Sequence, residues 1–102
     1  DEMSLSGYAM GADGAIGSTF NLMPEKYIEI KTLFEEKKLE KALEKQHIVN
    51  TIIEQLLAIG LYPAIKYALT LMGIDCGESR KPFKPLDKQA RRLVEDLVKK
   101  YF

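Results

Sequence analysis

The stretch that decides the fold lies near the start of the chain and is punctuated by glycine: Gly11-Ala12-Asp13-Gly14-Ala15-Ile16-Gly17-Ser18-Thr19-Phe20-Asn21. Within it, residues 14–18 are small or apolar and are bounded by turn-forming residues, which predicts a short strand that is buried on both faces. Strands of this kind occur in parallel sheets, because helices cover both faces of such sheets.

Helical patterns flank this predicted strand. A short helix is predicted over residues 2–10 and another over residues 24–37. Pro24 suits the first turn of the second helix, and Glu25 complements its dipole. A helix directly after a strand is the order of a βα unit.

The rest of the chain predicts three more helices. The longest periodic stretch carries its apolar residues on one stripe and stops at Gly60: Leu39, Ala42, Leu43, Val49, Ile52, Ile53, Leu56 and Leu57. A further helix opens at Pro63 and closes at Gly73. Residues 75–86 contain two prolines and form a loop, after which Asp87 caps a final helix that reaches Tyr101.

A single strand poses a problem, because its backbone N–H and C=O groups need partners on neighbouring strands. No second strand is visible in the 102 residues. Either residues 14–18 are a buried turn of an all-helical protein, or the chain is the end of a larger α/β domain. The strand followed by a helix favours the second interpretation.

Composition excludes several classes of protein. The chain is 46% hydrophobic and 29% charged, which is typical of a globular domain. Fifteen basic residues balance fifteen acidic ones, so no overall field attracts nucleic acid or an anionic membrane. Cys76 is the single cysteine, and no Cys/His cluster has the ligands of a zinc site. Without a long apolar run or a basic leader, we expect a cytoplasmic protein.

Two places could carry chemistry. Asp1 and Glu2 form an adjacent acidic pair, for which the simple alternative is capping of a helix. Ser18 follows the predicted strand, and ligands bind at the carboxyl ends of parallel strands. The alternative for Ser18 is an ordinary turn between strand and loop.

The other reactive residues do not indicate a catalytic centre within this sequence. His47 is expected on a helix surface, and Cys76 has no identifiable activating base. No lysine lies in an apolar strand, where desolvation would lower its pKa toward neutrality. A modest basic patch fits a helix terminus or a subunit contact better than nucleic acid, and consists of Arg80, Lys81, Lys84, Lys88, Arg91 and Arg92. The chain therefore looks like one piece of a site.

Several motifs resemble one enzyme family over essentially the whole chain. They are Asp1-Glu2-Met3, the stretch from Gly11 to Asn21, Gly60-Leu61-Tyr62-Pro63-Ala64-Ile65-Lys66, and Arg80-Lys81-Pro82-Phe83-Lys84-Pro85. Together they are similar to the C-terminal third of the N-acetylneuraminate lyases, which are class I aldolases of the dihydrodipicolinate synthase superfamily. The Asp-Glu pair and the Ile-Gly-Ser-Thr-aromatic-Asn run separate these lyases from the related synthases.

The resemblance implies the C-terminal segment of a (β/α)8 TIM barrel. Residues 1–38 would be the last barrel elements, namely the seventh helix, the eighth strand at 14–18 and the eighth helix. Residues 39–102 would be a C-terminal extension of three helices. The orphan strand would then pair with the first and seventh strands, which lie outside this chain, since a whole barrel needs roughly 250 residues.

The resemblance also implies an activity, the reversible cleavage of N-acetylneuraminate to N-acetylmannosamine and pyruvate. The family's Schiff-base lysine, on the sixth strand, and its relay tyrosine, on the fifth, precede Asp1, so no catalytic residue falls in this chain. The family's substrate-binding residues carry over to Asp1, Glu2 and Ser18. The expected partners are the upstream barrel, the sugar acid and pyruvate, in a homotetramer. No cofactor, metal, nucleic acid or membrane is expected.

Two other functions stay open. One is a stand-alone helical interaction module, which would be monodisperse and would unfold cooperatively, whereas a barrel segment would aggregate or be only partly ordered. The other is the same barrel acting on a different 2-keto acid, against which the Asp1-Glu2 pair argues.

Overall fold

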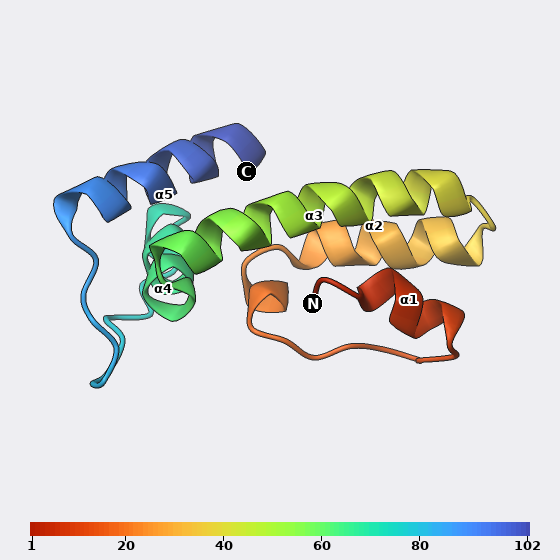
Figure 1. The fold of residues 1–102 in the computed structure, drawn as a ribbon, viewed down its shortest axis with the longest axis horizontal. Coiled ribbons are helices and arrows are strands. Elements are labelled where there is room, and N and C mark those ends of the chain that lie inside the picture. The colour runs from red at the N-terminus through yellow and green to blue at the C-terminus, as the bar shows by residue number, and fades with distance from the viewer. The chain divides into compact units, whose positions relative to one another are not determined.

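The computed structural model describes residues 1–102 and contains five α-helices and one short 3-10 helix (Figure 1). It divides into two compact units, Asp1–Ile53 and Glu54–Phe102, each with its own buried side chains. No single helix is long and apolar enough to cross a membrane. Only the bent pair of α3 (Leu39–Ile59) and α4 (Leu61–Leu71) meets that test, by length and composition taken together.

The first unit contains α1 (Ser4–Ala9), η1 (Thr19–Asn21), α2 (Pro24–Glu35) and most of α3. Pro24 opens α2 with Glu25 in its first turn, as predicted. The helix ends at Glu35 because Lys37 adopts a positive φ of 62° and its N–H donates to the carbonyl of Phe34 at 2.9 Å. The predicted helix over residues 24–37 is therefore confirmed, with an end two residues earlier.

The core of the first unit draws on every one of its helices. On α3, the buried face repeats at helical spacing through Ala42, Gln46, Val49 and Ile53. The remaining buried apolar residues are Leu5, Tyr8, Leu22, Met23, Tyr27, Ile30 and Ile52. Leu39 and Leu43, which were predicted on the buried stripe, are exposed, because the buried face is centred on Gln46 and Val49.

The second unit contains the end of α3, α4 and α5 (Lys88–Tyr101). The Asp87 carboxylate accepts a hydrogen bond from the backbone N–H of Ala90 at 2.8 Å, so the predicted cap is confirmed. Helix α4 begins at Leu61, two residues before Pro63, which its first turn tolerates. The core of this second unit consists of Leu56, Ala64, Ile65, Ala68, Leu69, Val94 and Leu97. Leu57, which was predicted on the buried stripe, is exposed.

Residues 14–18 do not form the predicted strand. Residues 14–17 are irregular (Figure 1). Ser18 lies in a turn, and Ile16 is fully exposed. The physical reason is that a strand needs a neighbour to accept and donate its backbone hydrogen bonds, and the chain contains no other strand. The prediction of a strand buried on both faces is therefore wrong for this structure.

Candidate functional site

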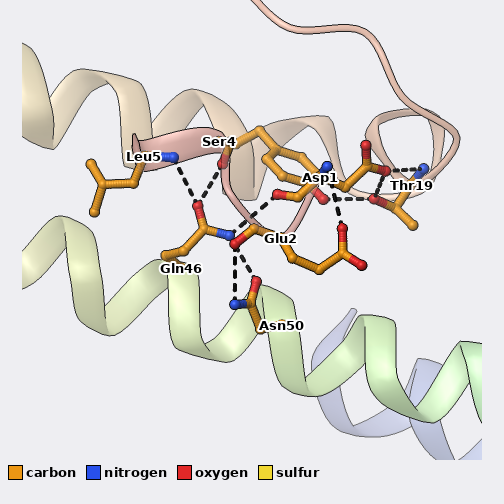
Figure 2. A network of polar contacts seen from close by, with 8 residues as sticks. Asp1, Glu2, Ser4, Leu5, Thr19, Gln46 and Asn50 are labelled. Carbon is orange, nitrogen blue, oxygen red and sulfur yellow. Dashed lines mark hydrogen bonds and ion pairs between the residues drawn. The ribbon is translucent and has the colours of Figure 1, made fainter. Parts of the chain in front are cut away.

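The first residue of the acidic pair is bound to the segment that follows residues 14–18. The carboxylate oxygen Oδ2 of Asp1 accepts two hydrogen bonds from Thr19, one from the backbone N–H at 3.0 Å and one from the hydroxyl Oγ1 at 2.5 Å (Figure 2). These residues are eighteen positions apart in the sequence. The structure therefore brings the two sequence-predicted places, the acidic pair and the end of the 14–18 segment, into one site.

Gly17 permits this close approach. A Cβ atom built on Gly17 would lie 1.8 Å from Oδ1 of Asp1, far inside the contact distance of carbon and oxygen. The Asp1 side chain thus occupies the space beside Gly17 that any other residue would fill. This packing explains why glycine, and not only a turn-forming residue, stands before Ser18.

Behind Thr19 lies a buried tyrosine. The hydroxyl of Thr19 is 2.6 Å from the phenolic oxygen of Tyr27, on the first turn of α2. The Tyr27 ring stacks on Phe20, with centroids 3.7 Å apart. Burial raises the pKa of the Tyr27 phenol above its usual value, and the charge of Glu2 adds to this shift. The phenol therefore keeps its proton at neutral pH.

Glu2 is the open member of the acidic pair. Its side chain is more than half exposed, whereas that of Asp1 is largely covered. A hydrogen bond from its own backbone amide lowers the pKa of the Glu2 carboxyl, against a smaller opposing effect of desolvation. Glu2 is therefore a carboxylate at neutral pH and can accept hydrogen bonds from a ligand.

Helix capping does not explain the acidic pair. The first helix begins at Ser4, not at Glu2, and it has no acidic residue in its first turn. Its N-cap position is Met3, and no side chain caps it. The capping alternative raised by the sequence is therefore wrong, and the Asp1 carboxylate is used to bind Thr19.

Two amides of α3 hold the backbone of the acidic pair. Gln46 donates to the carbonyl of Asp1 at 3.3 Å and to the side chain of Asn50 at 2.8 Å. Asn50 donates to the carbonyl of Glu2 at 3.2 Å (Figure 2). On its other side, Gln46 accepts from the hydroxyl of Ser4 at 2.5 Å and from the N–H of Leu5 at 3.0 Å.

Sequence reasoning missed Gln46, although a signal was present. It is only 4% exposed and lies four residues after Ala42 and three before Val49, on the buried face of α3. A polar residue in phase with a buried stripe is expected to have hydrogen-bond partners, since burying it unpaired is costly.

Ser18 lies beside the residue that binds Asp1. It occupies the N-cap position of η1, where its hydroxyl makes no capping hydrogen bond. Its carbonyl accepts from the side chain of Asn21 at 3.2 Å. The structure places Ser18 next to Thr19 and records no hydrogen bond between Ser18 and either acidic residue.

The other residues singled out in the sequence take no part in the hydrogen bonds of this site. His47 is exposed on α3, as predicted, and Cys76 is an exposed free thiol. No group of three or more His, Cys, Asp and Glu residues could hold a metal ion. No lysine of the chain is buried. The arrangement can accept and donate hydrogen bonds to a hydroxylated ligand, and it supplies no amine in desolvated surroundings.

Comparison with known proteins identifies close relatives along the whole chain. The model of the dihydrodipicolinate synthetase family matches residues 1–101. The N-acetylneuraminate lyase of Fusobacterium nucleatum is 41% identical over 101 residues, which are 99% of this chain and 35% of that protein. The chain thus spans about a third of the length of its relatives and corresponds to their C-terminal part.

Solved structures agree with the sequence comparison. CdNal from Clostridium difficile, crystallised in complex with mannosamine, matches with a TM-score of 0.96 at 38% identity, over 100% of this chain and 35% of that one. The Fusobacterium nucleatum lyase complexed with pyruvate matches with a TM-score of 0.94 at 40% identity, over the same shares. These neighbours are TIM barrels, so the predicted fold class, a C-terminal barrel segment that is mostly helical, is confirmed.

Proposed function

Because the chain belongs to the dihydrodipicolinate synthetase family, we propose that it is the C-terminal part of an N-acetylneuraminate lyase. The complete enzyme would reversibly cleave N-acetylneuraminate to N-acetylmannosamine and pyruvate through a lysine Schiff base located outside this chain. This segment would supply the sugar-binding residues Asp1, Glu2 and Ser18. One observation carries the proposal: Asp1 is held against the residues that follow Gly17, in a chain similar to these lyases along its whole length.

The chemistry of the site suits a polyol. A carboxylate can accept from two hydroxyls, and a site built in this way rejects analogues that lack them. Glu2 is ionised and its side chain is more than half exposed, with Oε2 lying 3.4 Å from the amino group of Asp1. A carboxylate in this position can accept further hydrogen bonds from a hydroxylated ligand. The relative from Clostridium difficile binds mannosamine, an amino sugar with several hydroxyls. These observations support a hydroxylated sugar acid as the substrate.

Imine formation would belong to another part of the enzyme. A lysine that attacks a ketone at neutral pH needs a lowered pKa, which burial in an apolar pocket provides. None of the lysines here is buried. The relative from Fusobacterium nucleatum binds pyruvate, the ketone that such a lysine would hold.

The division of the chain follows from the same proposal. Residues 1–38 would be the last barrel elements, with α1 as the seventh barrel helix, residues 14–18 as the eighth strand and α2 as the eighth helix. Residues 39–102 would form the helical extension. The upstream barrel would supply strands on both sides of residues 14–18 and cover Ile16, which is fully exposed in this chain. A cytoplasmic homotetramer without a cofactor completes the proposal.

A substitution at Glu2 tests the sugar-binding role in the complete enzyme. Glu2→Gln keeps the shape of the side chain but replaces a charged acceptor with an amide that also donates. We expect kcat/KM for N-acetylneuraminate to fall roughly ten- to two-hundredfold, since one charge-assisted contact contributes about 1.5–3 kcal/mol. Borohydride trapping of the pyruvate imine should stay nearly unchanged, because pyruvate has no polyol.

Glu44→Gln is the matched control, because Glu44 is an exposed residue of α3 without an ion pair. Glu44→Gln should leave both kcat/KM for N-acetylneuraminate and borohydride trapping of the pyruvate imine unchanged. The free energy of unfolding of Glu2→Gln should change by less than about 1 kcal/mol, as is typical for surface positions. Equal loss with sugar and with pyruvate, or an unfolded variant, would make Glu2 a structural residue.

A further inference from the structure

We propose that Thr19 and Tyr27 are positioning residues, which fix the Asp1 carboxylate for the sugar through a directed chain of hydrogen bonds from Tyr27 to Thr19 to Asp1. The inference rests on the proposed function, because it assigns a role to residues that hold a proposed substrate ligand. Neither residue belongs to the substrate-binding set named above.

The direction of the chain follows from counting protons. The Asp1 carboxylate can only accept, so the Thr19 hydroxyl, 2.5 Å away, must donate its single proton to it. The Thr19 oxygen can then only accept from Tyr27, at 2.6 Å, so the phenol donates. Each donation polarises the next bond, which strengthens the contact at the carboxylate.

The surroundings keep this chain in one arrangement. Thr19 is 1% and Tyr27 is 3% exposed, so water does not compete for their hydroxyls. Stacking on Phe20 restricts the tyrosine ring. Because burial raises the pKa of the Tyr27 phenol, it remains a donor throughout the neutral range.

The two carboxylate oxygens of Asp1 have different tasks as a result. Both donors of Thr19 bind Oδ2, and no donor of the protein forms a hydrogen bond with Oδ1. Oδ1 lies beside Gly17, the residue immediately before Ser18. Thr19 therefore fixes one oxygen and leaves the other able to accept a substrate hydroxyl near Ser18.

Three variants of the complete enzyme test the hydrogen bonds from Tyr27 to Thr19 to Asp1. Thr19→Val keeps the shape but removes the hydroxyl, and should lower kcat/KM for N-acetylneuraminate about ten- to a hundredfold, mainly through KM. Thr19→Ser restores the donor and should recover activity to within about threefold of wild type. Tyr27→Phe removes only the outer donor and should cost about three- to tenfold.

Two matched controls make the same chemical changes elsewhere. Thr51→Val removes a hydroxyl that donates to the His47 carbonyl on the exposed side of α3, and Tyr67→Phe removes one that contacts Glu95. Neither should change kcat/KM. In all five proteins, borohydride trapping of pyruvate should match wild type, which shows that the barrel is folded.

The outcomes separate this inference from the proposed function. If Thr19→Ser is as impaired as Thr19→Val, or if pyruvate trapping falls in parallel, Thr19 acts through packing and the inference is overturned. If the wild-type enzyme does not cleave N-acetylneuraminate, the proposed function fails, and crystal structures of wild type and Thr19→Val still decide the positioning role. An Asp1 carboxylate in the same orientation in both structures would contradict it, whereas a displaced carboxylate would support it.

Discussion

In the complete enzyme, Gly17→Ala should lower kcat/KM for N-acetylneuraminate by about a hundredfold. The added Cβ would lie 1.8 Å from Oδ1 of Asp1, so the carboxylate must move by more than 1 Å to relieve the clash. Such a shift breaks its contacts with Thr19, which are 2.5 and 3.0 Å long. A displacement of about 1 Å at a substrate contact can cost a hundredfold in rate. Steady-state kinetics with the sugar measure this loss, and imine trapping with pyruvate shows separately whether the lysine site is intact.

Gly14→Ala is the matched control for this variant. The same methyl group at Gly14 meets no atom of residues 1–102 within 4 Å, and the backbone there does not have the positive φ that favours glycine. We expect kinetics close to wild type. Equal losses at the two positions would mean that the 14–18 segment needs glycine for its backbone in the complete barrel, and the close approach of Asp1 would not be the reason.

Residues 1–102 by themselves should form no imine with pyruvate and cleave no N-acetylneuraminate. Imine formation at neutral pH requires an amine with a lowered pKa in a closed pocket, and no lysine here is buried. Incubation with pyruvate and borohydride, followed by intact mass measurement, should leave the mass of this chain unchanged.

The complete protein provides the positive control for the trapping experiment. It should gain one pyruvate-derived adduct, and peptide mapping should place that adduct before Asp1. A stable adduct on any lysine among residues 1–102 would contradict the proposed division of labour. Size-exclusion chromatography of the isolated chain is informative as well, because the stand-alone helical module predicts a monodisperse species.

The helices could be predicted because their signals are local. Pro24, Gly60 and Asp87 mark helix boundaries, and the structure places a terminus within two residues of each. Which residues of α3 are buried is harder to predict, since Leu39 and Leu43 follow the apolar spacing but are exposed. Periodicity identifies a face and does not say how much of it a neighbour covers.

The segment at residues 14–18 shows the limit of local reasoning. Its composition is that of a buried strand, yet Ile16 is fully exposed because the chain has no strand to pair with it. The composition of these residues favours a strand, but the chain contains no strand that could pair with it. Only the resemblance to a barrel family explained both facts.

Only some residues of the candidate site were proposed from the sequence. The resemblance pointed to Asp1, Glu2 and Ser18, whereas Thr19, Tyr27 and Gln46 were not foreseen. Each of these three side chains binds a residue far away in the sequence or in the next element, so no spacing rule reveals the contact. For Gln46, its phase on the buried face was the available clue.

The most direct test of the central claim compares two substrates of the complete protein in one assay of pyruvate release. N-acetylneuraminate carries the polyol that Asp1, Glu2 and Ser18 are proposed to bind, and 2-keto-3-deoxygluconate is a shorter sugar acid of another pyruvate aldolase. We predict that kcat/KM for N-acetylneuraminate is higher by at least about a hundredfold, as expected when several hydrogen-bonding groups of a site would otherwise stay unpaired. Equal rates with both sugar acids, or faster cleavage of 2-keto-3-deoxygluconate, would contradict the assignment.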